Sequence, residues 1–206
     1  MTAPDGNHFS AFAAEPAERV RRSAVIVLPD VRGLFGFYED LAVRFAEHGH
    51  PAIAIDYFGR TAGTEERPAD FPFMDHVAET HSDGINADIA AAGAHLRERH
   101  PEAELYAVGF CFGGTVAWAA ATHGHGLAGV IGYYGRTEVD RPAGDGPIWD
   151  RCHLMEGRLL ALFGGADPAI PPENVARFEA ALEEAGVDHE VVVYPGAPHS
   201  FFDRSQ

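Results

Sequence analysis

The sequence contains no lysine, only two cysteines and no long hydrophobic run. Its 15 basic residues are all arginine and stand against 31 acidic residues, so the formal net charge is −16. A surface of this charge repels phosphate backbones and anionic lipid, so neither nucleic acid nor a membrane is expected as a partner. The two cysteines, Cys111 and Cys152, are too few for a disulfide framework in 206 residues.

The apolar runs are too short to cross a membrane. The longest of them, such as Ala24–Leu28, have the length of a strand. The opening segment MTAPDGNHFS has neither a basic start nor an apolar stretch, so we expect no signal peptide. We therefore expect a cytoplasmic protein.

Patterns that bind nucleotides or metals are missing from the sequence. No G-x-G-x-x-G pattern or P-loop follows a predicted strand, so no nucleotide cofactor is expected. Neither H-E-x-x-H nor a pair of C-x-x-C motifs occurs. The pairs His48/His50 and His123/His125 lie near predicted helix ends, where histidine is favourable without a metal. We expect no cofactor and no metal.

Short apolar segments rich in β-branched residues alternate with longer segments of helical spacing. The predicted strands are Ser23–Leu28, Ala52–Asp56, Leu105–Gly109, Val130–Tyr133, Leu159–Phe163 and Glu190–Tyr194. The predicted helices are Tyr38–His48, Ile85–Arg99, Gly114–Thr122 and Glu173–Ala185. This alternation predicts an α/β fold with a mostly parallel central sheet flanked by helices on both faces. We expect a single domain over residues 1–206, with residues 1–20 at its periphery.

A cysteine follows the predicted strand Leu105–Gly109 in a glycine-rich turn. The segment Gly109–Gly114 has the sequence GFCFGG and leads into a predicted helix, so Cys111 stands where a G-x-nucleophile-x-G elbow holds its nucleophile. Glycines suit such a turn because it is strained and brings backbone segments close together. The helix start also predicts a lowered pKa for the Cys111 thiol. The alternative interpretation is a buried cysteine beside glycines that only permit packing.

An aspartate and a histidine follow later predicted strands. Asp167 lies just after Leu159–Phe163, and His199 lies after the last predicted strand. Taken singly, each has an ordinary alternative as a loop-starting aspartate or a surface histidine. The order nucleophile, acid, histidine, each directly after a strand, is the order found in hydrolases built on such a sheet. We therefore predict that Cys111, Asp167 and His199 are the catalytic residues.

The chain resembles the dienelactone hydrolase family, which has the α/β-hydrolase fold, from about Ser23 to Phe202. The motifs that carry the resemblance are GFCFGG around Cys111, GYYG at 132–135, FGGADP around Asp167 and YPGAPHSFF around His199. The resemblance implies that the whole of this stretch folds as one α/β hydrolase and that its partner is a small-molecule ester or lactone.

The resemblance also implies a Cys–His–Asp triad. In it the Cys111 sulfur attacks an ester or lactone carbonyl and forms a thioester, His199 accepts and returns the proton, and Asp167 orients the imidazole. The backbone N–H groups of Phe112 and Val31 take the positions of the family's oxyanion hole. The alternative hypothesis is a non-catalytic member of the same fold that binds a ligand or partner through the same cleft.

The chain departs from the family beside the predicted site. The family's glutamate after the first strand is Asp30 here, which leaves two interpretations open: a contact to the resting thiol, or a turn residue. The family binds a substrate carboxylate with arginines, one of them four residues beyond the histidine, where this chain has Asp203 followed by Arg204. Arg32 is a candidate replacement, since guanidinium suits carboxylate. Tyr134 is a further residue expected to line the site. Arg60, Arg136 and Arg141 also lie near predicted strand ends, where each either binds such a carboxylate or is a solvated surface residue.

The sequence has seven residues after His199, where relatives in the family continue into a final helix against the sheet. We expect that helix to be absent, so that the sheet face near the last strand is bare or is covered by another chain. A monomer and a homodimer both remain open.

Overall fold

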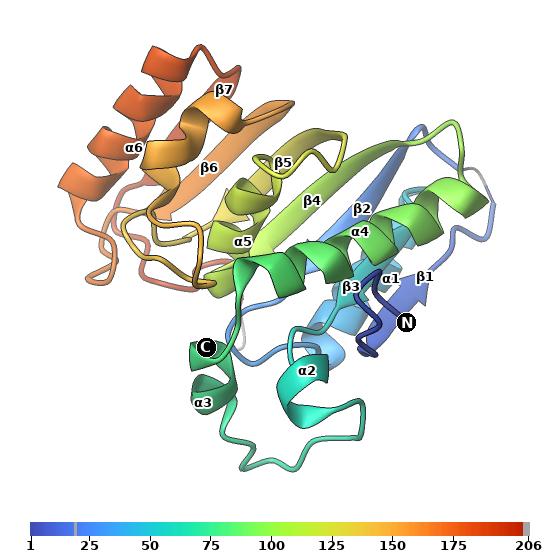
Figure 1. Cartoon of the computed structure of the whole chain (residues 1–206). Coiled ribbons are helices and arrows are strands. Elements are labelled where there is room, and N and C mark those ends of the chain that lie inside the picture. Colours follow the sequence, from blue (N-terminus) through green and yellow to red (C-terminus); the bar gives the residue numbers. More distant parts are fainter. Residues whose placement is uncertain (19, 204–206) are drawn as a thin grey trace.

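A computed structural model describes residues 1–18 and 20–203 of the protein (Figure 1). Within these residues, seven strands form one sheet in the order β1-β3-β2-β4-β5-β6-β7. The first strand, β1, runs antiparallel to β3, and the other neighbouring pairs are parallel. The strands are β1 (Ala11–Ala14), β2 (Ser23–Leu28), β3 (Ala52–Ile55), β4 (Glu104–Phe110), β5 (Leu127–Tyr133), β6 (Arg158–Gly164) and β7 (His189–Tyr194).

The helices of the described residues connect these strands. They are α1 (Gly36–Glu47), α2 (Gly59–Ala62), α3 (Phe73–Ala78), α4 (Ser82–Arg99), α5 (Phe112–Ala120), α6 (Pro172–Ala185) and the 3-10 helix η1 (Ile148–Leu154). The predicted strands match β2 to β7, and the predicted helices match α1, α4, α5 and α6, with ends shifted by a few residues. The short elements β1, α2, α3 and η1 were not predicted, because four to seven residues are too few to show a clear period.

Side-chain contacts show which helices cover which face of the sheet. In β5, Gly132 faces the ring of Trp118 of α5, and that ring also packs against Phe178 of α6. Gly93 of α4 lies against Leu105, which points to the same face of β4 as Gly109 at the start of the α5 turn. Helices α4, α5 and α6 therefore share one face, as the ribbon also shows (Figure 1).

Helix α1 covers the opposite face. The ring of its Tyr38 packs against Phe110, which points away from α5 because side chains alternate along a strand. The predicted α/β fold with helices on both faces of a mostly parallel sheet is confirmed. Between α1 and β7 this face carries half-buried apolar side chains, among them Tyr106, Ile131 and Leu160. Within the described residues, the part of the sheet that was expected to be bare or covered by another chain thus exposes apolar surface.

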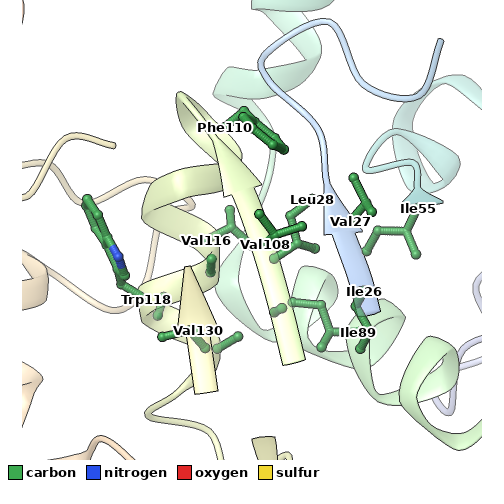
Figure 2. Close-up of a cluster of buried hydrophobic side chains, with 14 of the residues drawn as sticks. Ile26, Val27, Leu28, Ile55, Ile89, Val108, Phe110, Val116, Trp118 and Val130 are labelled. Carbon is green, nitrogen blue, oxygen red and sulfur yellow. The ribbon is translucent and has the colours of Figure 1, made fainter. Parts of the chain in front are cut away.

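The central strands carry the hydrophobic core. Ile26, Val27 and Leu28 of β2 are fully buried, and Figure 2 shows Ile89 of α4 beside Ile26. Full burial of one such side chain stabilises the fold by about 1.5–3 kcal/mol. Because this core holds the central parallel strands in register, their carboxyl ends lie at one edge of the sheet, where loops carry the candidate site.

No helix within residues 1–18 and 20–203 is long and apolar enough to span a bilayer.

Candidate active site

Cys111 occupies a tight turn between β4 and α5. Its φ of 55° lies in the left-handed region, which costs a non-glycine residue energy and persists only where the surroundings enforce it. The glycines around it allow the chain to pass closely: a Cβ on Gly109 would lie 1.8 Å from the carbonyl oxygen of Gly113. A Cβ on Gly113 would lie 2.1 Å from the carbonyl oxygen of Leu28. The predicted elbow is therefore present, and it packs directly on the end of β2.

Three side chains that follow three different strands form a continuous hydrogen-bonded chain at this turn. Nε2 of His199 lies 3.2 Å from Sγ of Cys111, and Nδ1 of the same ring lies 2.6 Å from Oδ2 of Asp167. A carboxylate only accepts hydrogen bonds, so the proton resides on Nδ1 and Nε2 is left to accept from the thiol. The other oxygen of Asp167 accepts from the backbone N–H of Ala169 at 2.9 Å. The structure brings together the three residues that the sequence singles out.

The acidity of the Cys111 thiol is the opposite of the prediction. Burial raises its pKa to about 11, and the nearby charges of Asp30 and Asp167 act in the same direction. The N–H of Phe112 at the start of α5 and the charge of Arg32 oppose this shift but do not overcome it. The prediction of a lowered pKa is wrong because it considered only the helix terminus and not the loss of hydration. The resting thiol is protonated at neutral pH.

One backbone donor faces the sulfur, and a second lies in the turn beside the elbow. Phe112 is the first residue of α5, so its N–H has no acceptor within the helix, and it is directed at Sγ of Cys111. Val31 lies in the turn after β2, in which Gly33 N–H donates to the carbonyl of Asp30 at 3.0 Å. Among the described residues, the N–H of Val31 has no acceptor. Because Gly113 packs on the end of β2, this turn lies beside the elbow.

An arginine next to the site is held by the protein's own carboxylates. Arg32 donates from Nε and Nη2 to both oxygens of Asp30, at 2.5–3.1 Å. The same Nη2 lies 3.4 Å from Oδ2 of Asp203, and the guanidinium stacks on the ring of Phe35 at 4.4 Å. Asp30 also accepts from the backbone N–H of Arg32 at 2.8 Å. Asp30 is thus the turn residue, and its charge acts on the Cys111 thiol. Its side chain hydrogen-bonds to Arg32 and its backbone N–H to Tyr38, so a direct contact to the thiol stays a prediction.

Two tyrosines lie beside these residues, Tyr134 next to His199 and Tyr38 next to Asp30. The ring of Tyr134, whose φ is 39°, packs edge-on against His199 at 5.1 Å between ring centroids. Burial raises the pKa of Tyr134, and the charges of Cys111, Asp30 and Asp203 add to that shift. Its hydroxyl therefore stays protonated and available as a donor. The hydroxyl of Tyr38 accepts from the N–H of Asp30 at 3.0 Å. The sequence did not single out Tyr38, because only the fold places it next to Asp30.

The remaining candidate arginines have other partners or lie in solvent. Arg60 binds Asp5 at 2.7 Å and Asp88 at 2.6 Å. Arg136 pairs with the neighbouring Glu138 at 2.5 Å, and Arg141 is exposed. Arg204 lies outside the described residues.

The histidine pairs at the helix ends are engaged by protein groups. His123 contacts Asp145 at 2.9 Å, and His125 contacts the side chain of Asn86 at 2.8 Å. Nδ1 of His48 lies 2.8 Å from the carbonyl of Arg44. In the part of the chain that the structure describes, no group of three or more His, Cys, Asp or Glu side chains is arranged to hold a metal ion.

The sequence pattern of the dienelactone hydrolase family matches residues 9–206. The chain belongs to the dienelactone hydrolase family. It is a hydrolase, and the resemblance noted in the sequence is confirmed over the stretch that holds Cys111, Asp167 and His199.

Proteins from other organisms are similar to most of this chain. A Salmonella typhimurium protein described as "Putative carboxymethylenebutenolidase" is 30% identical over 204 residues, which cover 95% of this chain and 74% of that protein. A Bradyrhizobium protein described as "Probable 2-oxo-3-(5-oxofuran-2-ylidene)propanoate lactonase" is 28% identical and is covered over 82% of its length. A crystal structure from Klebsiella pneumoniae, described as "Putative Dienelactone Hydrolase", has a TM-score of 0.85 and 27% identity, and the match covers 99% of this chain and 89% of that one.

Proposed function

We propose that the protein hydrolyses a small ester or lactone through a thioester on Cys111. The observation that supports this most directly is the hydrogen-bonded chain from Asp167 through His199 to the Cys111 sulfur on a strained elbow. The names of the relatives, which denote a butenolide hydrolase and a lactonase, support the same substrate class.

The proposed reaction begins with the protonated thiol. As a carbonyl carbon approaches, the S–H proton of Cys111 passes to Nε2 of His199, and the sulfur forms the new bond to carbon. The tetrahedral oxyanion accepts hydrogen bonds from the N–H groups of Phe112 and Val31, and removing one such donor typically costs about 10²–10³ in rate. Asp167 keeps Nδ1 protonated and stabilises the imidazolium that forms.

Collapse of the intermediate breaks the carbon–oxygen bond to the leaving group. His199 gives its proton to that oxygen, which leaves as an alcohol or, in a lactone, remains attached to the acyl group as a hydroxyl. Water then gives a proton to His199 and attacks the thioester carbon. The carbon–sulfur bond breaks, His199 returns the proton to the sulfur, and the carboxylic acid is released. Because the resting thiol is protonated, the imidazole must act as a base in each cycle.

A stopped-flow assay tests this proposal. With 4-nitrophenyl acetate, we expect a burst of nitrophenol equal to the enzyme concentration, followed by slower turnover. Cys111→Ala and prior alkylation should each abolish both phases, whereas Cys152→Ala, which removes a thiol that is only 2% exposed and lies in η1, should retain them. Turnover that survives Cys111→Ala would refute the thioester mechanism.

The alternative, a member of the fold that binds a ligand without turnover, has one observation in its favour. The raised pKa of Cys111 leaves little thiolate at neutral pH. Absence of both burst and turnover between pH 6 and 9 would favour this alternative. A cytoplasmic location stays a prediction from the sequence, which allows both a monomer and a homodimer.

A further inference from the structure

The surroundings of the Cys111 sulfur are rich in negative charge. Asp30, Asp167 and Asp203 are each less than a tenth exposed, and Arg32 is the arginine that contacts two of them. The charges of Asp30 and Asp167 both act on the Cys111 thiol, and those of Asp30 and Asp203 both act on the adjacent Tyr134. Two carboxylates thus act on the reacting sulfur, and a third, Asp203, lies beside Arg32 and acts on Tyr134.

The guanidinium of Arg32 is committed to these carboxylates. Its Nε and Nη2 form the fork that an arginine uses to bind a carboxylate in two places, and Asp30 fills that fork. Asp203 takes a further position at Nη2, and Phe35 covers one face of the group. Arg32 is therefore neutralised before any substrate arrives.

The cavity beside Arg32 is also lined by acidic side chains. It has a volume of about 530 Å³ and is lined by apolar side chains that include Leu34 and Phe73, and by Glu39, Glu65 and Glu66. The second arginine of this cavity, Arg67, is paired with the buried Asp56 through both of its terminal nitrogens. The space next to the site thus adds apolar surface and negative charge.

We propose that this site selects esters and lactones whose acyl group is uncharged, and that Asp203 is a specificity-determining residue because it excludes substrates with a carboxylate. The inference rests on the hydrolase function proposed above and specifies its substrate class. It separates this chain from the relatives whose name denotes a carboxymethylene-substituted lactone.

The physical reason is competition for one cation. An incoming carboxylate that binds the Nε and Nη2 donors of Arg32 has to displace Asp30 or Asp203, each of which is buried and would lose its ion pair with that arginine. A carboxylate that leaves those pairs intact meets the buried charges of Asp30 and Asp167 beside the sulfur, where repulsion is stronger than in bulk water. An uncharged acyl group meets neither obstacle.

Two esters that differ in charge test the proposal. In methyl 4-nitrophenyl adipate the far end of the acyl chain is a methyl ester, whereas in 4-nitrophenyl hydrogen adipate it is a carboxylate. We expect kcat/KM for the methyl ester to exceed that for the anion by about tenfold or more, and Asp203→Asn to reduce this ratio at least about fivefold. Asp188→Asn is the matched control, since it removes a carboxylate that is 66% exposed and pairs with Arg158 away from the site.

The outcomes of the ester assay are distinct. A wild-type enzyme that hydrolyses the anion as fast as the methyl ester would overturn the proposal. So would an Asp203→Asn enzyme that is active on the methyl ester but has an unchanged ratio. Failure of both esters to react would refute the proposed hydrolase function instead. In that case, the alkylation rates of Cys111 decide whether the site discriminates against negative charge.

Alkylation of Cys111 measures the same selectivity without turnover. Iodoacetamide is neutral and iodoacetate is an anion, and peptide mass spectrometry gives the rate of each at Cys111. We expect the rate ratio of iodoacetamide to iodoacetate in the wild type to exceed the ratio for free 2-mercaptoethanol by about fivefold or more. This measurement also covers the case in which Asp203→Asn does not fold. A ratio equal to that of the free thiol, or no labelling by either reagent, would overturn the proposal.

Discussion

Sγ of Cys111 lies 3.2 Å from Nε2 of His199, although 88 positions separate the two residues in the chain. The same sulfur has a pKa raised to about 11 by burial, so this contact joins a protonated thiol to the imidazole. The thiol is within hydrogen-bonding distance of the imidazole, so its proton can pass to Nε2 of His199 as the sulfur attacks a carbonyl carbon.

The carboxylate behind the imidazole is expected to control the rate. In Asp167→Asn the hydrogen bond to Nδ1 of His199 loses its anionic acceptor and the ring can take the wrong tautomer. We expect kcat for 4-nitrophenyl acetate to fall by about 10²–10⁴ while the fold is retained, as judged by circular dichroism. Asp150→Asn, which removes a carboxylate 62% exposed, should change kcat less than about twofold. A kcat for Asp167→Asn close to the wild-type value would contradict the role given to this residue.

The raised pKa of Cys111 predicts a steep pH dependence of alkylation. The thiolate is the reactive form, so the rate with iodoacetamide should rise about tenfold per pH unit from pH 7 to 10. Cys152 also has a pKa raised to about 11 but is only 2% exposed, and it should react more slowly at every pH. Mass spectrometry of labelled peptides distinguishes the two sites. A rate for Cys111 that levels off below pH 8 would show that the thiol is acidic after all.

Packing of α5 on β5 depends on the absence of a side chain at Gly132. A Cβ at this position would lie 2.3–2.6 Å from the indole of Trp118, which is fully buried. We expect Gly132→Ala to lower the free energy of unfolding by about 1–3 kcal/mol, as in other overpacked cores. Gly36→Ala is the matched control, because a Cβ at the first residue of α1 meets nothing within 4 Å. Urea unfolding measures both; equal stabilities of the two variants would show that Trp118 moves aside without cost.

His125 is expected to make the protein less stable in acid. Burial lowers its pKa to about 4, with the charges of His123 and Arg97 acting in the same direction. A free histidine has a pKa of about 6.5, so between about pH 4 and 6.5 the unfolded chain binds more protons than the folded one at this site. This contribution to stability is present above that range and is lost as the pH falls through it.

Substitution of His125 tests the assignment. His125→Gln should lose less stability between pH 7 and 4.5 than the wild type, as measured by urea midpoints, because glutamine binds no proton there. His153→Gln changes an exposed histidine and serves as the control. If the urea midpoints of His125→Gln and the wild type change identically with pH, the loss of stability in acid arises from other groups.

The sequence alone was enough to predict the six parallel strands, the four longer helices between them and the residues that meet at the carboxyl ends of those strands. Apolar segments such as Ala24–Leu28 are buried on both faces, and this pattern is local. The sequence did not predict β1, because its four residues show no clear alternation of apolar and polar side chains. Phe9, two residues before β1, is nevertheless completely buried. Short edge elements depend on what they pack against, which no local pattern records.

The sequence by itself determined that Cys111, Asp167 and His199 each follow a parallel strand, and parallel strands bring such residues to one edge of a sheet. Only the tertiary structure decided the protonation of the thiol and the partners of Arg32. The pKa depends on how much water the surrounding side chains exclude, and the contact between Arg32 and Asp203 joins positions 171 residues apart. Hydration and long-range charge pairing arise only when the chain is packed, so neither can be deduced from neighbours in the sequence.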